Sequence, residues 1–335
     1  MVIFLASLLL SAGDITRHFV KEGSNGQGTS WKNAFGDLQQ ALAVALPGEA
    51  VWVAQGTYTP TTSTDRTASF VIPQGVAIYG GFAGTEKKLE ERNLNANLTI
   101  LSGEIGNAAD LEDNSFTVVY FNKVDATTQI NGFVITGGYA NGMVEGADLT
   151  TCGGAVYNNG EFGVSSPKIV KCIFVDNFSR EGAAIYNYAN EGDASPFISD
   201  CKFINNRSDF NGGAIFNDGS YGTCNPTIKN CHFEGNYSMY GAGLLNRAVS
   251  GICQPVVVDC AFVNNFSVVR GGAIYNQREG RGTCEALVDG CVFEDNGSTI
   301  GNSDVDETLR MVNQTDDQPN RSSIRQRRTT TVITY

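Results

Sequence analysis

Acidic residues recur beside cysteines in the second half of this 335-residue chain. Asp200, Asp259 and Asp289 each stand just before a cysteine of a repeating pattern. Carboxylate oxygens are the ligands that Ca²⁺ prefers in proteins, so the three residues are candidate calcium ligands and Ca²⁺ is the candidate cofactor. Asp and Asn are also favoured in turns because their side chains bond to the local backbone. The pattern therefore predicts either a calcium site or a row of tight corners.

The cysteines fall into columns of equivalent repeat positions. One column holds Cys172, Cys201, Cys231, Cys260 and Cys291, and a second holds Cys224, Cys253 and Cys284. Two interpretations stay open: a buried stack of free thiols, or disulfides between neighbouring rungs about 4.8 Å apart, such as Cys253–Cys284. A zinc site is not expected, because Cys-x-x-Cys is absent and the only histidines are His18 and His232. His232 is expected to point outward from a strand.

Two motifs repeat at a nearly constant spacing. Gly-Gly-Ala-Val-Tyr-Asn at residues 153–158 returns at residues 182–187, 212–217, 241–246 and 271–276, so its asparagines are 29 or 30 residues apart. The cysteines of the first column follow the same rhythm, at steps of 29, 30, 29 and 31 residues. A fixed period of this size indicates a solenoid of stacked units.

The units predict strands and not helices. They are rich in Gly, Asn, β-branched and aromatic residues, with turn signals between short apolar runs, and each unit is expected to hold three short strands. Stacking of equivalent positions predicts a parallel β-helix with a file of phenylalanines at 174, 203, 233, 262 and 293. Two asparagine ladders are expected as well, one of Asn177, Asn206, Asn236, Asn265 and Asn296, the other of Asn158, Asn187, Asn217, Asn246 and Asn276.

The chain divides into a lead-in, a rod and a tail. Residues 1–13 are apolar and predict a signal peptide, although no basic residue precedes them, so a buried N-terminal strand is the alternative. A polar lead-in to residue 32 precedes the only amphipathic helix, expected at residues 38–46 as a cap and stopped by Pro47-Gly48. The β-helix is expected over residues 14–296, with regular coils at 153–296 and one early strand spanning 130–135. Residues 297–335 are polar and predict a disordered tail.

The overall charge limits the classes of partner that the chain is expected to bind. A formal charge of −12 argues against nucleic acid or an anionic membrane surface as the partner. No segment is apolar over a length that would span a bilayer, because the N-terminal run is too short. The expected partners are a polysaccharide or a cell-surface protein.

The two repeat motifs resemble those of right-handed parallel β-helix proteins of the pectin-lyase-like superfamily. They are especially similar to the polymorphic outer-membrane protein repeat, and Gly28-Thr29-Ser30-Trp31 and Tyr79-Gly80-Gly81-Phe82 are similar to the start of its secreted bacterial relatives. The resemblance implies an all-β, right-handed parallel β-helix. It also implies a secreted or cell-surface location, associated with the outer membrane and often with adhesion.

Three functions remain open at this point. The first is a surface scaffold for adhesion or for glycan or protein binding, with loops at residues 59–67 and 138–151 carrying specificity. The second is a polysaccharide lyase or glycoside hydrolase, since lyases of this fold pair acidic calcium ligands with a basic residue. The acidic candidates are Asp176, Asp200, Asp259, Asp289 and Asp295, and the basic candidates are Lys168, Lys171, Lys202, Lys229, Arg180, Arg207, Arg247 and Arg270. The third is a structural module of a longer exported protein.

Overall fold

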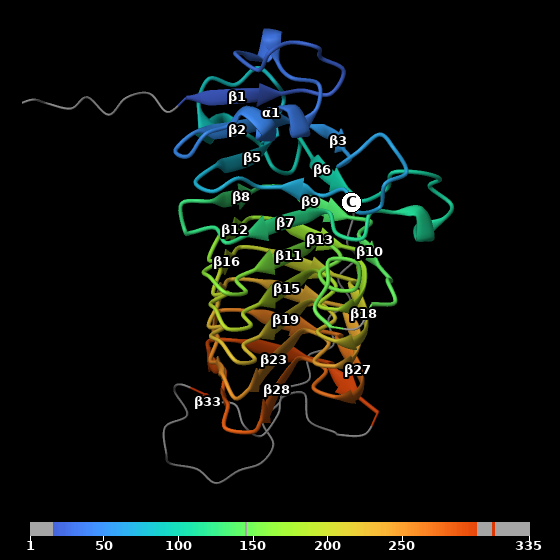
Figure 1. Cartoon of the computed structure of the whole chain (residues 1–335), viewed down its shortest axis with the longest axis vertical. Helices are drawn as coiled ribbons and strands as arrows, with labels where there is room; N and C mark the ends of the chain where they lie inside the picture. Colours follow the sequence, from blue (N-terminus) through green and yellow to red (C-terminus); the bar gives the residue numbers. More distant parts are fainter. Residues whose placement is uncertain (1–15, 145, 300–309, 312–335) are drawn as a thin grey trace, which may run out of the picture.

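The computed structural model describes residues 16–144, 146–299 and 310–311. These residues wind into a parallel β-solenoid, in which equivalent strands of successive turns lie side by side (Figure 1). The all-β parallel β-helix predicted from the repeat is confirmed. The predicted signal peptide at residues 1–13 lies outside the described residues, and so does most of the predicted tail at residues 297–335.

Two long sheets, here named A and B, form two sides of the rod. Sheet A contains β1 Arg17–Val20, β2 Ala50–Ala54, β5 Ala77–Phe82, β8 Gln129–Asn131, β12 Lys168–Val170, β16 Phe197–Ser199, β20 Thr227–Lys229, β25 Val256–Val258, β30 Leu287–Asp289 and β33 Arg310–Met311. Sheet B contains β3 Gly56–Tyr58, β6 Thr99–Ser102, β9 Val134–Thr136, β13 Ile173–Val175, β17 Lys202–Ile204, β21 His232–Glu234, β26 Ala261–Val263 and β31 Val292–Glu294. A regular coil passes from A to B through a single tight corner.

Two further sheets, C and D, complete the coil. Sheet C contains β4 Phe70–Val71, β7 Val119–Asn122, β11 Val156–Asn159, β15 Ile185–Tyr188, β19 Ile215–Asp218, β23 Leu244–Val249 and β28 Ile274–Glu279. Sheet D contains β10 Tyr139–Ala140, β14 Phe178–Glu181, β18 Arg207–Asn211, β22 Tyr237–Tyr240, β27 Phe266–Arg270 and β32 Gly297–Ser298. A small pair, β24 Ile252–Cys253 and β29 Thr283–Cys284, lies between C and A in the last coils.

The strand count differs from the sequence-based expectation in three places. Each regular unit has at least four strands and not three, because the polar residues of sheet D read as a turn in sequence. The single strand expected over residues 130–135 is two strands, β8 and β9, because Gly132 adopts a φ of 83° and forms the corner between sheets A and B. The coils also extend to Ser298, and β33 of the predicted tail pairs with β30.

A helix lies near the N-terminal end of the rod, as expected (Figure 1). Helix α1, Leu38–Val44, begins at Asp37, whose side chain accepts a hydrogen bond of 2.9 Å from the Gln39 N–H. Its apolar face is buried against β1, β2 and β4. Strand β1 was not expected within the polar lead-in; it adds a rung to sheet A before the helix. Short 3₁₀ segments are η1 Trp31–Asn33, η2 Leu89–Glu91 and η3 Leu111–Asp113.

The five predicted phenylalanines stack in single file inside the regular coils. Neighbouring ring centroids are 4.9, 4.6, 4.5 and 5.3 Å apart, and no two neighbouring rings are tilted by more than 9°. Phe174, Phe203, Phe233 and Phe262 are fully buried. Burial of each ring contributes about 1.5–3 kcal/mol. The register predicted from the repeat is therefore confirmed at the level of single side chains.

Both asparagine ladders form as predicted. From Asn177 to Asn296, each side-chain amide donates to the Oδ1 of the next rung at 2.8–3.1 Å. From Asn158 to Asn276 the corresponding distances are 2.8–3.0 Å. The amides are buried, and a chain of partners satisfies them where water is excluded. Each ladder pins one turn of the coil above the next.

The cysteines form the predicted columns as free thiols. In the first column the backbone N–H groups of Cys172, Cys231 and Cys260 each donate to the sulfur of the next rung at 3.4 Å. The second column packs with small alanines in a separate apolar cluster. None of the nine cysteines forms a disulfide bond, which supports the thiol-stack interpretation over the disulfide one. Cys152, which belongs to neither cysteine column, is buried against the outer face of sheet C.

Candidate functional site

A glycine corner joins sheet D to sheet C in each regular coil. Gly182, Gly212, Gly241 and Gly271 have φ values of 63°, 62°, 60° and 70°. At Gly212, a Cβ would lie 2.6 Å from the carbonyl oxygen of Ile215 and 2.8 Å from the Cβ of Phe216. Glycine takes this left-handed conformation without steric cost. The repeated glycine motif therefore turns the chain sharply, which brings the end of each D strand beside the outer face of sheet C.

Three columns of side chains meet at this corner. One column on the outer face of sheet C is aromatic or apolar: Tyr120, Tyr157, Tyr186, Phe216, Leu245 and Tyr275. The neighbouring column is largely polar: Asn122, Asn159, Tyr188, Asp218, Arg247 and Gln277. The third lies at the end of sheet D: Cys152, Glu181, Asn211, Tyr240 and Arg270. We call the space between these columns the C–D groove.

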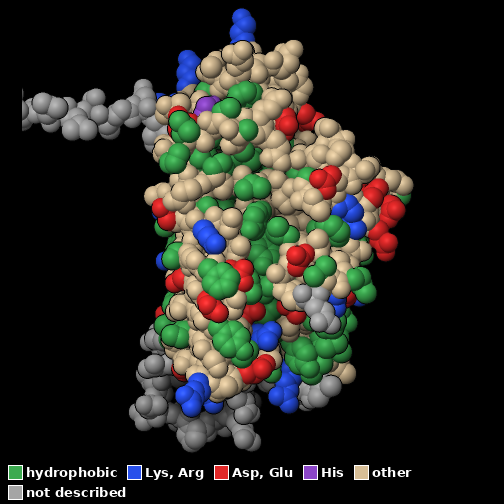
Figure 2. Space-filling model, in the orientation of Figure 1, with side chains coloured by type: hydrophobic (Ala, Val, Ile, Leu, Met, Phe, Trp, Pro, Cys, Tyr) green, Lys and Arg blue, Asp and Glu red, His purple; other side chains and the backbone are tan. Residues whose placement is uncertain are grey.

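The loop at residues 138–151 covers the part of the C–D groove nearest the N-terminal coils. Ala147 and Leu149 pack against the aromatic column, and the Tyr157 hydroxyl donates to the Ala147 carbonyl at 3.4 Å. Further along the rod the groove opens into a cavity. The cavity has a volume of about 330 Å³ and is lined by Glu181, Phe210, Asn211, Tyr240, Arg247, Tyr275 and Gln277. Figure 2 views this face, on which hydrophobic, acidic and basic side chains are intermixed.

Two carboxylates and one guanidinium give the groove its electrostatic character. Burial raises the pKa of Glu181, and the nearby Asp218 raises it further, while Asn211 and Arg247 oppose the shift. Asn211 donates to Glu181 Oε1 at 3.2 Å. Asp218 is buried and accepts hydrogen bonds from the Tyr186 hydroxyl at 3.1 Å and the Ser220 N–H at 3.0 Å. Glu181 is thus held toward its neutral form, in which it can donate as well as accept a hydrogen bond.

The side chain of Arg247 has an unsatisfied hydrogen-bond donor. Its Nε is buried without a hydrogen-bond partner, and it forms no ion pair within 4 Å with any described residue. An unmatched buried donor costs about 1–3 kcal/mol, so such a group is a natural point of contact for a ligand oxygen. Arg247 is also the one basic candidate from the sequence that lines the 330 Å³ cavity of the C–D groove.

The tyrosines beside the groove stay protonated at neutral pH. Burial raises the pKa of Tyr157 and of Tyr186, and burial together with Glu161 raises the pKa of Tyr188 to about 12. Tyr240 and Tyr275 stack with their centroids 5.8 Å apart. The groove therefore combines neutral hydroxyls and aromatic surface with the planar polar groups of Asn211, Arg247 and Gln277.

The three predicted calcium ligands do not converge. Asp200 and Asp259 occupy the A–B corner with φ of 56° and 54°, and Asn230 stands between them, donating to Asp200. Gly290, not Asp289, holds this corner in the last coil; Asp289 lies on β30, paired with Val258. Across the described residues no three His, Cys, Asp or Glu side chains could share one metal ion. The turn interpretation accounts for Asp200 and Asp259, and calcium binding stays a prediction.

Other predicted residues are spread around the rod. Asp200 shares a recess of about 200 Å³ with Lys171 and Lys202, and Asp176 shares one of about 490 Å³ with Arg207. Lys168 and Lys229 are exposed on sheet A. Arg180 and Arg207 lie over the rings of Phe210 and Tyr237, at 5.3 and 5.2 Å. Arg270 is exposed at the end of β27. His232 is on β21 and pairs with Glu234 at 2.9 Å.

Sequence reasoning did not identify Glu181 and Asp218. Both are next to a repeat motif, but in each case only one unit carries an acid at that position, so no periodic signal marks them. Asp218 directly follows the ladder residue Asn217, and Glu181 directly precedes the corner Gly182. A departure from the repeat beside an invariant corner is the signal that could have singled them out.

The chain is similar to one known sequence repeat and, at low sequence identity, to several solved structures. Among solved structures, the pectate lyase Pel9A is similar to this chain, with 14% sequence identity and a TM-score of 0.49. The match covers 88% of this chain and 73% of that one. A pectin methylesterase from Aspergillus niger has 15% identity and a TM-score of 0.43, with coverage of 91% and 82%. A rhamnogalacturonan lyase has 11% identity and a TM-score of 0.36, with coverage of 80% and 87%.

The match found by sequence covers two short segments of the chain. No curated protein matches the sequence. The sequence model of the Chlamydia polymorphic membrane protein repeat matches residues 200–218 and 259–277. Each matched segment runs from the corner aspartate, through the stacked phenylalanine and ladder asparagine, to the glycine corner and the following C strand. In two of its regular coils the chain is therefore similar to the Chlamydia polymorphic membrane protein repeat.

Proposed function

We propose that this chain is a surface-displayed or secreted β-helix scaffold that binds a glycan in the C–D groove. The repeat that it resembles is named for a membrane protein, which supports an exported setting associated with the outer membrane. No helix in the described part of the chain combines the length and hydrophobicity needed to cross a bilayer. The rod would then act as a rigid mount, with the loop at residues 138–151 forming one end of the binding surface.

The chemistry of the groove suits a sugar. Ligand sites combine apolar surface with a few convergent polar groups, and 330 Å³ falls at the lower end of their usual range of about 300–1,000 Å³. Tyr240 and Tyr275 offer ring surface, and Asn211 and Gln277 offer amides that both donate and accept. The observation that carries the proposal is the buried Arg247 Nε, which has no partner and lines the same cavity.

A glycan array followed by calorimetry with the best-bound oligosaccharide tests the proposal. We expect Tyr240→Ala to weaken binding at least tenfold, because it removes ring surface from the groove. Tyr237→Ala is the matched control: Tyr237 lies on the same strand, is equally half-buried, and is not part of the cavity lining. Absence of binding to any glycan by the folded protein, or equal losses in both variants, would contradict a glycan-binding groove.

A second candidate function is glycosidic bond cleavage in the same groove, and the raised pKa of Glu181 is the observation that favours it. A protonated Glu181 could give its proton to the glycosidic oxygen while Asp218 accepts one from the attacking water, as carboxyl pairs do in glycosidases. Release of reducing ends, or of unsaturated uronates for a lyase, from a polysaccharide panel with and without calcium tests this. Activity that Glu181→Gln abolishes while binding survives would establish it, and inactivity on the whole panel would dismiss it.

A further inference from the structure

Three columns of corner residues in the regular coils share a left-handed backbone. The corner between sheets A and B is held by Lys171, Asp200, Asn230, Asp259 and Gly290, and the corner between B and D by Asp176, Asn205, Gly235, Asn264 and Asp295. The corner between sheets C and A is held by Phe162, Glu191, Tyr221, Ser250 and Gly280. Their φ values all lie between 50° and 65°, so the three columns impose the same steric demand.

The residues of the C–A corner are not those that favour this conformation. Asn, Asp and Gly adopt it at low cost, whereas a bulky side chain in it is an outlier. Of the thirteen non-glycine residues with positive φ in the described chain, only Phe162 and Tyr221 are aromatic, at 51° and 57°. Gly280 at the same corner position shows that the fold does not need a ring there. Strain that the fold does not require indicates a functional role.

Both strained rings are exposed. The exposed fraction is 64% for Phe162 and 61% for Tyr221, so neither ring contributes much to the core. Val164 and Ile252 lie in the column two positions beyond this corner and are 56% and 40% exposed. We call these four residues the corner ridge. An apolar patch that folding leaves uncovered indicates a contact surface.

The backbone holds the two rings at a fixed spacing. The Phe162 N–H donates to the Asn190 carbonyl at 3.1 Å, and the Tyr221 N–H donates to the Val249 carbonyl at 2.9 Å, in each case in the next coil. Only the rung of Glu191 separates the two residues, so at about 4.8 Å per rung their backbones are about 9.6 Å apart along the rod. The rings therefore mark two points on a line parallel to the rod axis.

Polar groups beside the ridge suit the hydroxyls of a neutral sugar. Asn190 donates to Glu161 Oε1 at 3.0 Å, and the Tyr188 hydroxyl donates to the same oxygen at 3.3 Å, so these groups are held in place one rung from the rings. Glu191 is the one charged residue between the two rings in the corner column, and it is exposed. Its carboxylate would repel an anionic chain, so a neutral ligand is favoured.

We infer that the corner ridge binds a neutral, β-1,4-linked polysaccharide lying along the rod. Successive sugar rings in such a chain are turned over, so every second ring presents the same face. Two rungs of the rod are about as long as two linked pyranose rings, so Phe162 and Tyr221 can each stack on a sugar of the same facing. None of the ridge residues lines the cavity of the C–D groove, so the inference is independent of the function proposed for that groove.

Co-sedimentation with insoluble polymers tests the inference. The full chain is mixed with cellulose and with chitin, which are neutral and β-1,4-linked, and with starch, which is neutral and α-1,4-linked. We expect saturable retention on cellulose or chitin that is at least tenfold tighter than on starch. Equal retention on all three polymers, or none on either β-linked polymer by the folded chain, would overturn the inference.

Glycine substitutions give a readout that a structural role would not produce. Phe162→Gly and Tyr221→Gly should each weaken retention at least fivefold and yet raise Tm, because glycine relieves the left-handed conformation while the ring is lost. Ser250→Gly is the matched control, since Ser250 is exposed in the same column at φ 52°. It should also raise Tm but change retention less than twofold. Equal losses of retention in all three variants, or a lower Tm in both aromatic variants, would contradict a binding role for the rings.

Discussion

The irregular N-terminal coils and the regular coils stack their strands and pack their side chains in different ways. In residues 153–298 identical side chains lie above one another, and the same corner returns in every turn. In residues 16–152 the rungs are irregular, loops differ in length, and a cluster of unlike aromatic rings takes the place of a single file. Repetition gives the regular coils ordered ladders, and irregularity gives the N-terminal coils a cavity of their own.

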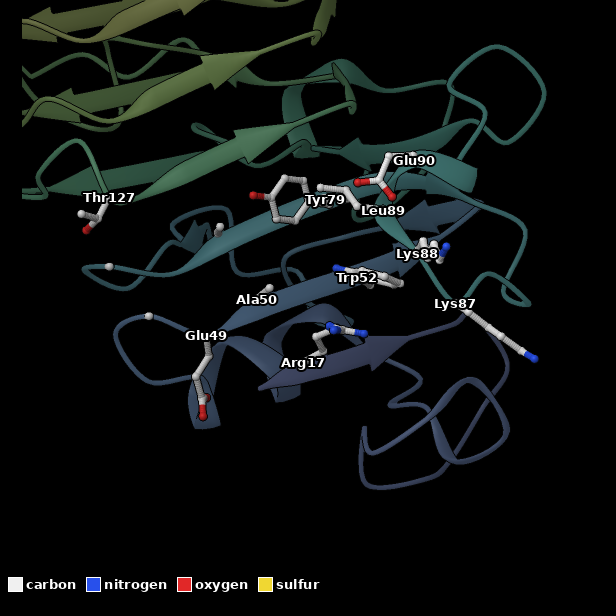
Figure 3. Close-up of a pocket in the computed structure, with 13 residues that line it drawn as sticks. Arg17, Glu49, Ala50, Trp52, Tyr79, Lys87, Lys88, Leu89, Glu90 and Thr127 are labelled. Carbon is white, nitrogen blue, oxygen red and sulfur yellow. The ribbon is translucent and has the colours of Figure 1, made fainter. Parts of the chain in front are cut away.

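The cavities of the two regions reflect this difference. The C–D groove arises because one glycine corner is repeated, and only its exceptions to the repeat, Glu181, Asp218 and Arg247, give it chemical character. A cavity of about 590 Å³ in the N-terminal coils arises where residues 87–90 lie beside Trp52 and Tyr79 of sheet A (Figure 3). A solenoid can therefore gain a cavity either by varying side chains on a repeated groove or by departing from the repeat in a single coil.

The largest effect should come from breaking the aromatic file. Phe233→Ala removes a fully buried ring from between Phe203 and Phe262, and we expect a loss of about 3–5 kcal/mol of unfolding free energy. Phe197→Ala, an exposed phenylalanine on β16, should cost less than about 1 kcal/mol. Urea denaturation followed by far-ultraviolet circular dichroism measures both. Similar losses in the two variants would mean that stacking contributes little to the stability of the regular coils.

A smaller effect should come from the glycine corner. Gly241→Ala places a left-handed alanine whose Cβ would lie 2.6 Å from the Leu244 carbonyl oxygen, so we expect a loss above the roughly 1–2 kcal/mol that the backbone conformation alone costs. Gly23→Ala, at φ 77° in the irregular region with no atom within 4 Å of the added Cβ, isolates the backbone cost. Urea denaturation of the pair measures the difference. If Gly241→Ala costs no more than Gly23→Ala, the close approach at the corner is unimportant.

The smallest effect should be a change in pH dependence. Because burial raises the pKa of folded Glu181 above its unfolded value, its contribution to stability is present at acidic pH and is lost as the pH rises through the folded pKa. Glu181→Gln should therefore raise Tm at pH 8 relative to wild type and leave it nearly unchanged at pH 4. Glu285→Gln, at an exposed site, should leave the profile unaltered. A parallel Tm profile for Glu181→Gln and wild type would contradict the raised pKa of the half-buried Glu181.

Prediction from sequence was correct where one repeat register fixes the positions of many residues at once. The spacing alone placed Phe174 to Phe293, the two asparagine ladders and both cysteine columns, since one register error would have scattered all of them. It was wrong for sheet D, whose short polar strands carry no apolar alternation, and for β1, which lies among turn residues. The corner at Gly132 was also hidden inside an apolar run.

The sequence by itself determined the architecture, because a period of about thirty residues with matching apolar, asparagine and glycine positions allows stacked parallel strands and little else. The tertiary structure alone decided which polar groups meet. Glu181 and Arg247 are 66 residues apart, and Trp52 and Lys88 are 36 apart, with no motif joining either pair. Winding converts sequence distance into a position around the rod, so only the folded chain reveals which exceptions to the repeat face the same space.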